Sequence, residues 1–473
     1  MSALRAEWTK FRSVPGWVRG AVIAALMILV FPVTGLGGGP PEQTRPVPIG
    51  PDGGPVVDGY YFVHRPLTGD GRITVAVGFA GAATPWAKAG LIVSAGPALG
   101  ARYAAIMVTG GHGARMQHDY VHDRAVPVEA PRWLRLTRAG DTITGEASAD
   151  GTHWTATETV RIPGLPATVD AGLFVACPSQ VEGLGTSLAA ATADFGAPEL
   201  TGGWPEADWS GGQVGAGSAT FGGYPREMPG GFEPTADGFT VTGAGDLAPA
   251  TRNDIAVGAS AADLLFGTFP ALIVIVVVAT LMITTEYRYG LIRTTLGAAP
   301  RRGRVLAAKA AVLAGVTFTT SLAAAVIGVP LWLRVVRGLG IYVFPASPGA
   351  LLRAEAGTAA VLAVTAVLAL AVGTILRRSA TAVTAVVVAT VLPHLLARTP
   401  FLPSAMANWL TTFTPAAALA VQQTLIRYPQ VDTVYTPAYG YFPLSPWAGL
   451  AVLCAYTAAA LGLAAFLLRR RDA

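Results

Sequence analysis

The chain has 473 residues, of which 52% are hydrophobic and only 13% are charged. Because soluble domains carry about a quarter charged residues, this composition excludes an ordinary soluble globule and favours a membrane protein. Residues 37–260 hold 13 basic and 22 acidic side chains, whereas the rest of the chain holds 20 and 6, which excludes a uniformly basic nucleic-acid-binding protein. The two cysteines, Cys177 and Cys454, are too far apart to indicate a disulfide framework, a zinc site or a redox pair.

Residues 1–19 are predicted to form a cytoplasmic amphipathic helix. Apolar residues recur there at helical spacing opposite basic ones: Leu4, Trp8 and Phe11 against Arg5, Lys10 and Arg12. Such a helix can lie in the inner membrane interface with its basic face on anionic lipid. The simpler alternative is a positively charged flank of the first membrane span.

Six apolar segments qualify, or nearly do, as transmembrane helices, because lipid cannot satisfy exposed backbone groups and its core is about 30 Å thick. They are Gly20–Leu36, Leu264–Ile283, Ala310–Leu333, Ala356–Leu376, Ser379–Ala397 and Trp447–Leu468. The first is the shortest, and a cleaved signal peptide is its alternative interpretation. Residues 401–427 are interpreted as two short re-entrant or interfacial helices on the outer side, because Pro415 splits this segment.

The distribution of Lys and Arg predicts the orientation, because positively charged flanks stay in the cytoplasm. With the N-terminus inside, we count 15 Lys and Arg in the cytoplasmic flanks and 5 in the short external loops. A multi-pass protein of the cell membrane is therefore expected, with both termini cytoplasmic and residues 37–258 extracellular.

The external segment 37–258 is predicted to be β-sheet. Arg72–Val77, Ala104–Val108, Trp133–Arg138 and Thr142–Ala147 read as strands, and Asp150 with Gly151 predicts a hairpin turn. The run PRWLRLTRAGDTITGEASADGTHWTAT, residues 131–157, together with residues 57–77, resembles concanavalin-like or laminin-G-like domains. The resemblance implies an extracellular β-sandwich, a concanavalin-like jelly roll, and in many such domains a bound glycan.

Two groups of polar residues in this segment are candidate sites. Glu146 and Asp150 are the nearest pair of carboxylates for glycoside hydrolysis, but Asp150 is better explained by the turn. His118 and His122 flank Asp119 at a spacing that could bring two imidazoles together on a metal, but a third ligand is not evident, and a solvated loop is the preferred interpretation.

The segment after the second span reads TTEYRYGLIRTTLGAAPRRGRVLAAKA, residues 284–310. It resembles the cytoplasmic loop of type-2 ABC transporter permeases, an E-Y-x-x-G-x-I-R-x-x-L run followed by a basic turn. The leader LRAEWTKFRS, residues 4–13, resembles the leader of the same family. The large insert between the first two spans departs from the commonest pattern.

The resemblance implies that residues 284–304 form a coupling loop with a short helix that docks on a cytoplasmic ATPase subunit. The residues that it assigns to this contact are Glu286, Tyr287, Arg288, Tyr289, Gly290, Ile292, Arg293 and Leu296. A plain basic loop is the alternative.

ATP and magnesium are expected only in that partner, because none of the three lysines lies in a G-x-x-x-x-G-K-[ST] loop. WSGGQ, at 209–213, is close to the LSGGQ signature of ABC ATPases, but it lies in the external segment and is interpreted as a coincidence. His394 is the best candidate for a functional ionisable residue inside a span, although its place toward the outer end favours a side chain that reaches the interface. Asp263 and Glu355 are placed at outer span ends, with Arg353 near enough to pair with Glu355.

The sequence therefore predicts a non-enzymatic permease subunit of an ABC exporter. It would pair with a second permease subunit and an ATPase, and move a lipid-like, polymeric or drug-like substrate. A membrane-anchored glycan-binding or sensor protein is the alternative, and a membrane-bound glycoside hydrolase is a third possibility that six spans argue against.

Overall fold

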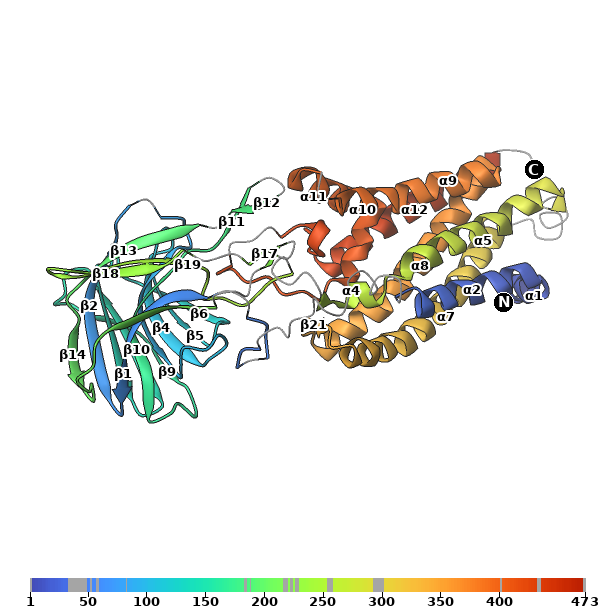
Figure 1. Ribbon diagram of the computed structural model, residues 1–473. Helices are drawn as coiled ribbons and strands as arrows, with labels where there is room; N and C mark the ends of the chain where they lie inside the picture. Colours follow the sequence, from blue (N-terminus) through green and yellow to red (C-terminus); the bar gives the residue numbers. More distant parts are fainter. Residues whose placement is uncertain are drawn as a thin grey trace. The chain divides into compact units, whose positions relative to one another are not determined.

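The computed structural model of the chain describes residues 2–32, 49–51, 53–56, 59–81, 83–182, 185–187, 189–215, 220–221, 224–225, 229–252, 258–291, 302–399, 402–431 and 435–470. It divides into two compact units. A helical unit comprises the described parts of 1–45, 257–426 and 435–473, and a β unit comprises those of 46–256 and 427–434. Figure 1 shows both units.

The helical unit contains five helices that are long and apolar enough to cross a membrane. They are α5 (Thr268–Arg288), α7 (Arg302–Gly338), α8 (Pro348–Leu376), the continuous pair α9 (Ser379–Thr390) with α10 (Leu392–Ala397), and α12 (Pro446–Arg470). α7 has 37 residues. At 1.5 Å per residue it is about 55 Å long, so it extends well beyond a hydrocarbon core of about 30 Å.

The first predicted span differs from the structure. α2 runs over Pro15–Val30, only 16 residues, and a 79° bend separates it from α1, Ser2–Ser13. The break is at Val14, because a residue before proline is forced into extended backbone and Pro15 starts the new helix. A sixth span is reached only if this bent pair is taken as one. Residues 33–36 of the predicted span lie outside the described residues.

The remaining helical elements are short. They are α4 (Ala261–Leu264), α11 (Ser404–Phe413), and the 3₁₀ helices η2 (Pro415–Gln422) and η3 (Pro437–Tyr439), with a two-residue parallel pairing of β20 (Gly258–Ala259) and β21 (Tyr342–Val343). The 401–427 segment thus holds two helices that are each too short to cross a bilayer, with the break at Thr414 before Pro415.

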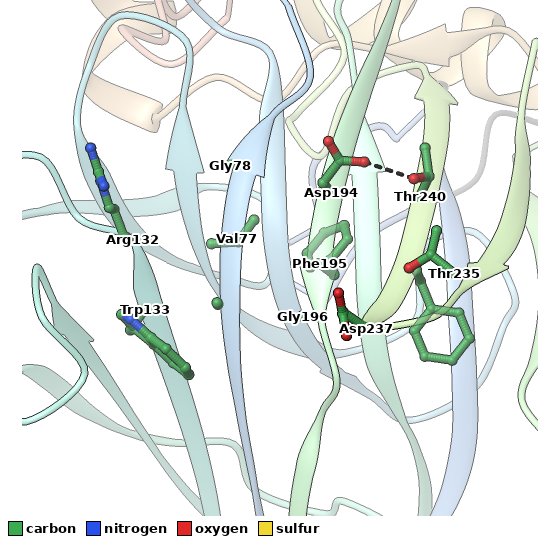
Figure 2. Close-up of a pocket in the computed structure, with 12 residues that line it drawn as sticks. Val77, Gly78, Arg132, Trp133, Asp194, Phe195, Gly196, Thr235, Asp237 and Thr240 are labelled. Carbon is green, nitrogen blue, oxygen red and sulfur yellow. Dashed lines mark hydrogen bonds between the residues drawn. The ribbon is translucent and has the colours of Figure 1, made fainter.

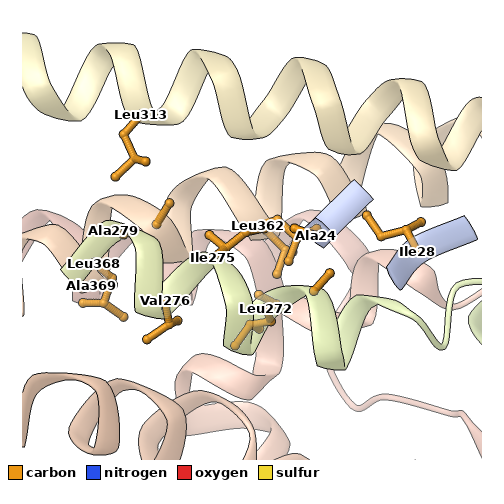
Figure 3. Close-up of a cluster of buried hydrophobic side chains, with 14 of the residues drawn as sticks. Ala24, Ile28, Leu272, Ile275, Val276, Ala279, Leu313, Leu362, Leu368 and Ala369 are labelled. Atoms are coloured by element: carbon orange, nitrogen blue, oxygen red, sulfur yellow. The ribbon is translucent and has the colours of Figure 1, made fainter. Parts of the chain in front are cut away.

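Small and branched apolar side chains hold the helical unit together. Figure 3 shows this cluster, in which Ala24 and Ile28 of α2 approach Leu272 and Ile275 of α5, with residues of α7 and α8 alongside. Many large apolar residues on the outside are exposed, for example Ile327 at 61% and Phe466 at 48%. A surface of this kind is stable in lipid and not in water, so the unit belongs in a membrane.

The β unit is a two-layer sandwich of antiparallel sheets. One sheet has the order β15-β1-β10-β3-β4-β5-β6, and the other β18-β19-β13-β2-β7-β8-β9, with β14 also pairing with β2. The strands of the first sheet are β15 (Ser210–Val214), β1 (Tyr60–Thr68), β10 (Thr168–Ala176), β3 (Lys88–Ser94), β4 (Tyr103–Thr109), β5 (Ala114–His118) and β6 (His122–Val126). Those of the second are β18 (Gly231–Thr235), β19 (Gly238–Ala244), β13 (Ala190–Gly196), β14 (Glu199–Gly202), β2 (Gly71–Phe79), β7 (Trp133–Ala139), β8 (Thr142–Ser148) and β9 (Thr155–Arg161). Two short hairpins complete the unit: β11 (Gln180–Glu182) with β12 (Gly185–Ser187), and β16 (Thr220–Phe221) with β17 (Tyr224–Pro225).

Alternation of apolar residues explains the two layers. Val63 and Leu67 of β1, Val75 of β2 and Leu134 of β7 belong to one buried core between the sheets. Their neighbours in sequence point to the opposite faces, as a period of two requires. The four strands predicted from sequence are confirmed as β2, β4, β7 and β8.

The other face of the seven-stranded sheet is also buried. Tyr60, Phe62, Tyr103, Tyr120 and Phe174 form a second apolar cluster there. Burial raises the pKa of Tyr120 to about 12. The chain itself covers this part of the face, so the tyrosines there are not a ligand platform.

Candidate functional site

Four charged side chains, three of them buried and Lys10 partly exposed, form a cluster in the helical unit at the junction of α1, α5 and α7. Lys309 Nζ donates to Glu7 Oε2 at 2.8 Å and to Glu286 Oε1 at 2.6 Å, and Lys10 also pairs with Glu286. The side chains of Lys309 and Glu286 are only 1% and 2% exposed. Charges this deeply buried are stable only when they are paired, so the cluster links the three helices.

The cluster brings together the two segments that carry the permease resemblance. Glu7 and Lys10 lie in the leader and Glu286 lies in the E-Y-x-x-G motif, so residues almost 280 positions apart meet through Lys309. Glu286 was predicted to contact a partner directly. Its burial instead places it inside the helical unit, where it holds the end of α5.

The residues after Glu286 reach the surface. Tyr289 is 69% exposed and Leu291 48%, and Arg288 and Gly290 are also exposed. Gly290 has φ of +70°, a conformation that favours glycine. Tyr287 is half-buried, with the Arg377 guanidinium 4.9 Å from its ring centre. Ile292, Arg293 and Leu296 lie outside the described residues.

The leader helix has a different pattern from the one expected. Leu4 and Trp8 are exposed, at 49% and 46%, as a lipid-facing pair would be. Phe11 is buried, with its ring centre 6.2 Å from that of Trp17. Lys10 pairs with Glu286 and is therefore not part of an outward basic face. The apolar spacing alone could not reveal this pairing.

The other ionisable residues at the spans are in structural positions. His394 is 4% exposed rather than at the interface, and its ring stacks on Phe269 at 4.8 Å. Neither of its ring nitrogens has a hydrogen-bond partner among the described residues. Asp263 forms a capping box with Ser260 at α4. Arg353 donates to the carbonyl of Gln423, and no Arg353–Glu355 pair forms in the described part of the chain.

In the β unit, the two candidate carboxylates for glycoside hydrolysis, Glu146 and Asp150, both have structural partners. Asp150 Oδ1 accepts from the amides of Thr152 and His153, each at 2.8 Å, as the hairpin turn predicted from sequence requires. These bonds, with the largest contribution from the His153 amide, hold the pKa of Asp150 well below its usual value. Glu146 Oε2 lies 3.5 Å from Arg135 Nη1.

The two imidazoles considered for a metal do lie together. The rings of His118 and His122 are stacked, with centroids 4.2 Å apart and planes inclined by 13°. Stacked rings direct their nitrogens sideways rather than toward one point. Within the described ranges, no group of three or more His, Cys, Asp or Glu side chains could hold a metal ion.

A shallow cavity of about 570 Å³ lies at the eight-stranded sheet. Figure 2 shows Arg132 and Trp133 on one side of it and Asp194, Asp237 and Thr240 on the other. Thr240 donates to Asp194 at 2.7 Å. An aromatic ring beside carboxylates and a guanidinium can take a polar ligand that also has an apolar face, such as a sugar.

No protein-family model matches the chain, and no curated protein matches it. A solved structure described as a functionally unknown protein from Saccharomyces cerevisiae aligns with 31% of this chain and 76% of its own, at 16% identity and a TM-score of 0.21. That similarity is too low to assign a fold or a function. From its own structure, the chain is a membrane-associated protein that joins an apolar helical unit to a β-sandwich-like unit.

Proposed function

We propose that this chain is the permease subunit of a type-2 ABC exporter. The proposal takes the bent pair α1–α2 as the first of six spans, places both termini in the cytoplasm and places the β unit outside the cell. It is supported by the apolar helices, by the Lys and Arg distribution and by the two sequence segments that resemble this family.

The observation that carries the proposal is the buried contact between those two segments. A coupling device must transmit force from a docking surface into the spans. Here the exposed segment from Arg288 to Leu291 begins two residues after Glu286, which Lys309 and Lys10 connect to α7 and α1. A partner that pushes on this segment would move three helices together, because separating them would expose paired charges.

In this proposal, ATP and magnesium bind in a separate cytoplasmic ATPase subunit. A second permease subunit, identical or not, completes the pore, and alternating access moves a lipid-like, polymeric or drug-like substrate outward. Tyr289 and Leu291 supply the apolar docking contact, and Arg288 supplies charge at its rim.

The test is co-purification of the tagged chain from its native membrane in several mild detergents, with mass spectrometry of what accompanies it. A stoichiometric protein with a Walker A loop is expected, and Tyr289→Ala should reduce its recovery at least about tenfold if this tyrosine anchors the contact. Tyr439→Ala, at another exposed tyrosine, is the matched control and should leave recovery unchanged. Absence of any such ATPase in every detergent would contradict the proposal.

A membrane-anchored glycan-binding protein is the second candidate, and the cavity beside Trp133 is the observation that favours it. It is tested by applying the full chain in detergent to an array of cell-wall oligosaccharides. Binding that is lost in Trp133→Ala, with no ATPase recovered, would favour this candidate over the permease.

A further inference from the structure

Three polar side chains of the β unit lie in the order of a hydrolytic triad. His64 Nε2 is 3.3 Å from Ser210 Oγ, and His64 Nδ1 is 3.1 Å from Asp170 Oδ1. We propose that the β unit carries an esterase site in which Ser210 is the nucleophile, His64 the general base and Asp170 the group that orients His64. This activity goes beyond the proposed transport function and does not depend on it.

The sheet topology brings these residues together. β1 lies between β15 and β10, so His64 has Ser210 directly opposite on one side. On the other side its direct partner is Gly172, which has no side chain, and Asp170 is the diagonal neighbour. All three side chains therefore project from the same face of the seven-stranded sheet.

The ring of His64 is held in one plane. It stacks on Phe62 with centroids 4.5 Å apart and an interplanar angle of 21°. With the proton on Nδ1, the imidazole donates to Asp170, and Nε2 accepts from the Ser210 hydroxyl. This is the tautomer that a general base needs in order to take the serine proton.

The nucleophile is accessible to a substrate. Ser210 is exposed, whereas the side chains of His64 and Asp170 are 20% and 24% exposed. Gly212, two residues along β15, faces the same side, and a Cβ added there would meet nothing within 4 Å. The space above Gly212 can take a small acyl group.

In the proposed reaction, backbone amides of strand β15 would supply the donors for the developing oxyanion. It is the first strand in the sheet order, so alternate backbone amides of β15 point away from β1. Ser210, Gly211 and Gly212 are consecutive there, and two glycines leave their amides unshielded by side chains of their own. Such amides stabilise the tetrahedral intermediate of acyl transfer.

The substrate class follows from this chemistry. Ser210 Oγ bonds to the carbonyl carbon of an ester as its proton passes to His64 Nε2, and the C–O bond then breaks as His64 returns that proton to the leaving alcohol. Water, activated in turn by His64, releases the carboxylic acid and restores the serine. The Asp170 carboxylate disfavours an anionic acyl chain, so the substrate is a neutral ester of a short carboxylic acid.

The WSGGQ run, residues 209–213, matches an ATPase signature only by coincidence. In the structure, the serine of this run is Ser210, and the two glycines follow it on the edge strand. The sequence did not predict a nucleophile at Ser210, because its partners lie 146 and 40 residues away on strands whose pairing local patterns do not reveal.

The full chain in detergent is treated with a fluorophosphonate probe, and labelled peptides are identified by mass spectrometry. We expect labelling of Ser210 and hydrolysis of p-nitrophenyl butyrate, both reduced at least about 100-fold in Ser210→Ala and in Asp170→Asn. Ser404→Ala removes an exposed serine of α11 and should change neither.

Retention of the elution profile on size exclusion shows that a variant is folded. Because Ser210 is exposed on an edge strand, Ser210→Ala is expected to pass this check even if Asp170→Asn does not. The proposal is overturned if Ser210 in the wild-type chain is labelled no faster than Ser404, or if folded Ser210→Ala hydrolyses the ester at the wild-type rate.

Discussion

Replacement of Lys309 by methionine tests the buried charge cluster directly. Lys309 makes two charge-assisted bonds, at 2.8 and 2.6 Å, and its side chain is 1% exposed. Its loss leaves Glu7 without a cationic partner among the described residues, whereas Glu286 keeps Lys10. Removing one partner of a buried ion pair costs about 3–5 kcal/mol, because the remaining charge stays buried.

For a unit of this size, the loss corresponds to a fall of roughly 10 °C in the midpoint of thermal unfolding. The assay is the fraction of chain that elutes as a single species on size exclusion after heating in detergent. Lys10→Met is the matched control, because Lys10 is 29% exposed and Glu286 keeps Lys309, and it should cost only about 1 kcal/mol.

Neutralising the stranded carboxylate should restore much of the loss. Glu7→Gln combined with Lys309→Met removes both charges of one pair and leaves Glu286 bound to Lys10. The cost of the buried charge then disappears, while the packing stays similar. A midpoint for Lys309→Met within about 2 °C of wild type, or no recovery in the double variant, would show that the cluster does not hold the helices together.

Three further outcomes are expected. Gly449→Ala in α12 should destabilise the helical unit by about 1–3 kcal/mol in the same heating assay, because the new methyl would lie 2.1 Å from a carbonyl oxygen of η2. Gly462→Ala in the same helix is the control: its methyl would meet nothing within 4 Å, so it should be neutral or slightly stabilising. In an NMR titration, the pKa of His153 should lie above its ordinary value, because its side chain bonds to Asp150, and Asp150→Asn should return the pKa toward normal. The pair therefore stabilises the turn at acidic pH, and this stabilisation is lost as the pH rises through the raised pKa. His394→Phe should change the unfolding midpoint by less than the equivalent of about 1 kcal/mol, because the buried imidazole stacks with two phenylalanine rings and has no hydrogen-bond partner among the described residues. A large loss of stability would show that its ring nitrogens form hydrogen bonds.

The sequence predicted much of the β unit because the relevant signals are local. Alternating residues from Trp133 to Ala147 mark two strands, and Asp150 with Gly151 marks the turn that follows. The long apolar helices were predicted for the same reason. The bend before Pro15 was missed, because the predicted interfacial helix, residues 1–19, runs through the break that this proline imposes.

The candidate sites depend on contacts that no local pattern contains. Glu7 and Lys309 are 302 residues apart, and although each lies in a segment that resembles a permease, no local pattern indicates that they pair. Glu286 was singled out by its motif, but its burial depends on how α1, α5 and α7 pack. His64 and Asp170 became interpretable only when strand order and register placed them beside Ser210.

The two proposals concern different units and can be separated by experiment. Ser210 and Lys309 lie in the β unit and the helical unit, with no shared hydrogen-bond partner among the described residues. Changes at independent sites add, so Ser210→Ala should abolish ester hydrolysis and leave the unfolding midpoint and ATPase recovery unchanged. Lys309→Met should lower the midpoint and leave fluorophosphonate labelling of Ser210 at its wild-type rate at temperatures where both chains are folded. If Lys309→Met slowed labelling under those conditions, the ester site would depend on the state of the helical unit, and its role would have to be sought within the transport cycle rather than beside it.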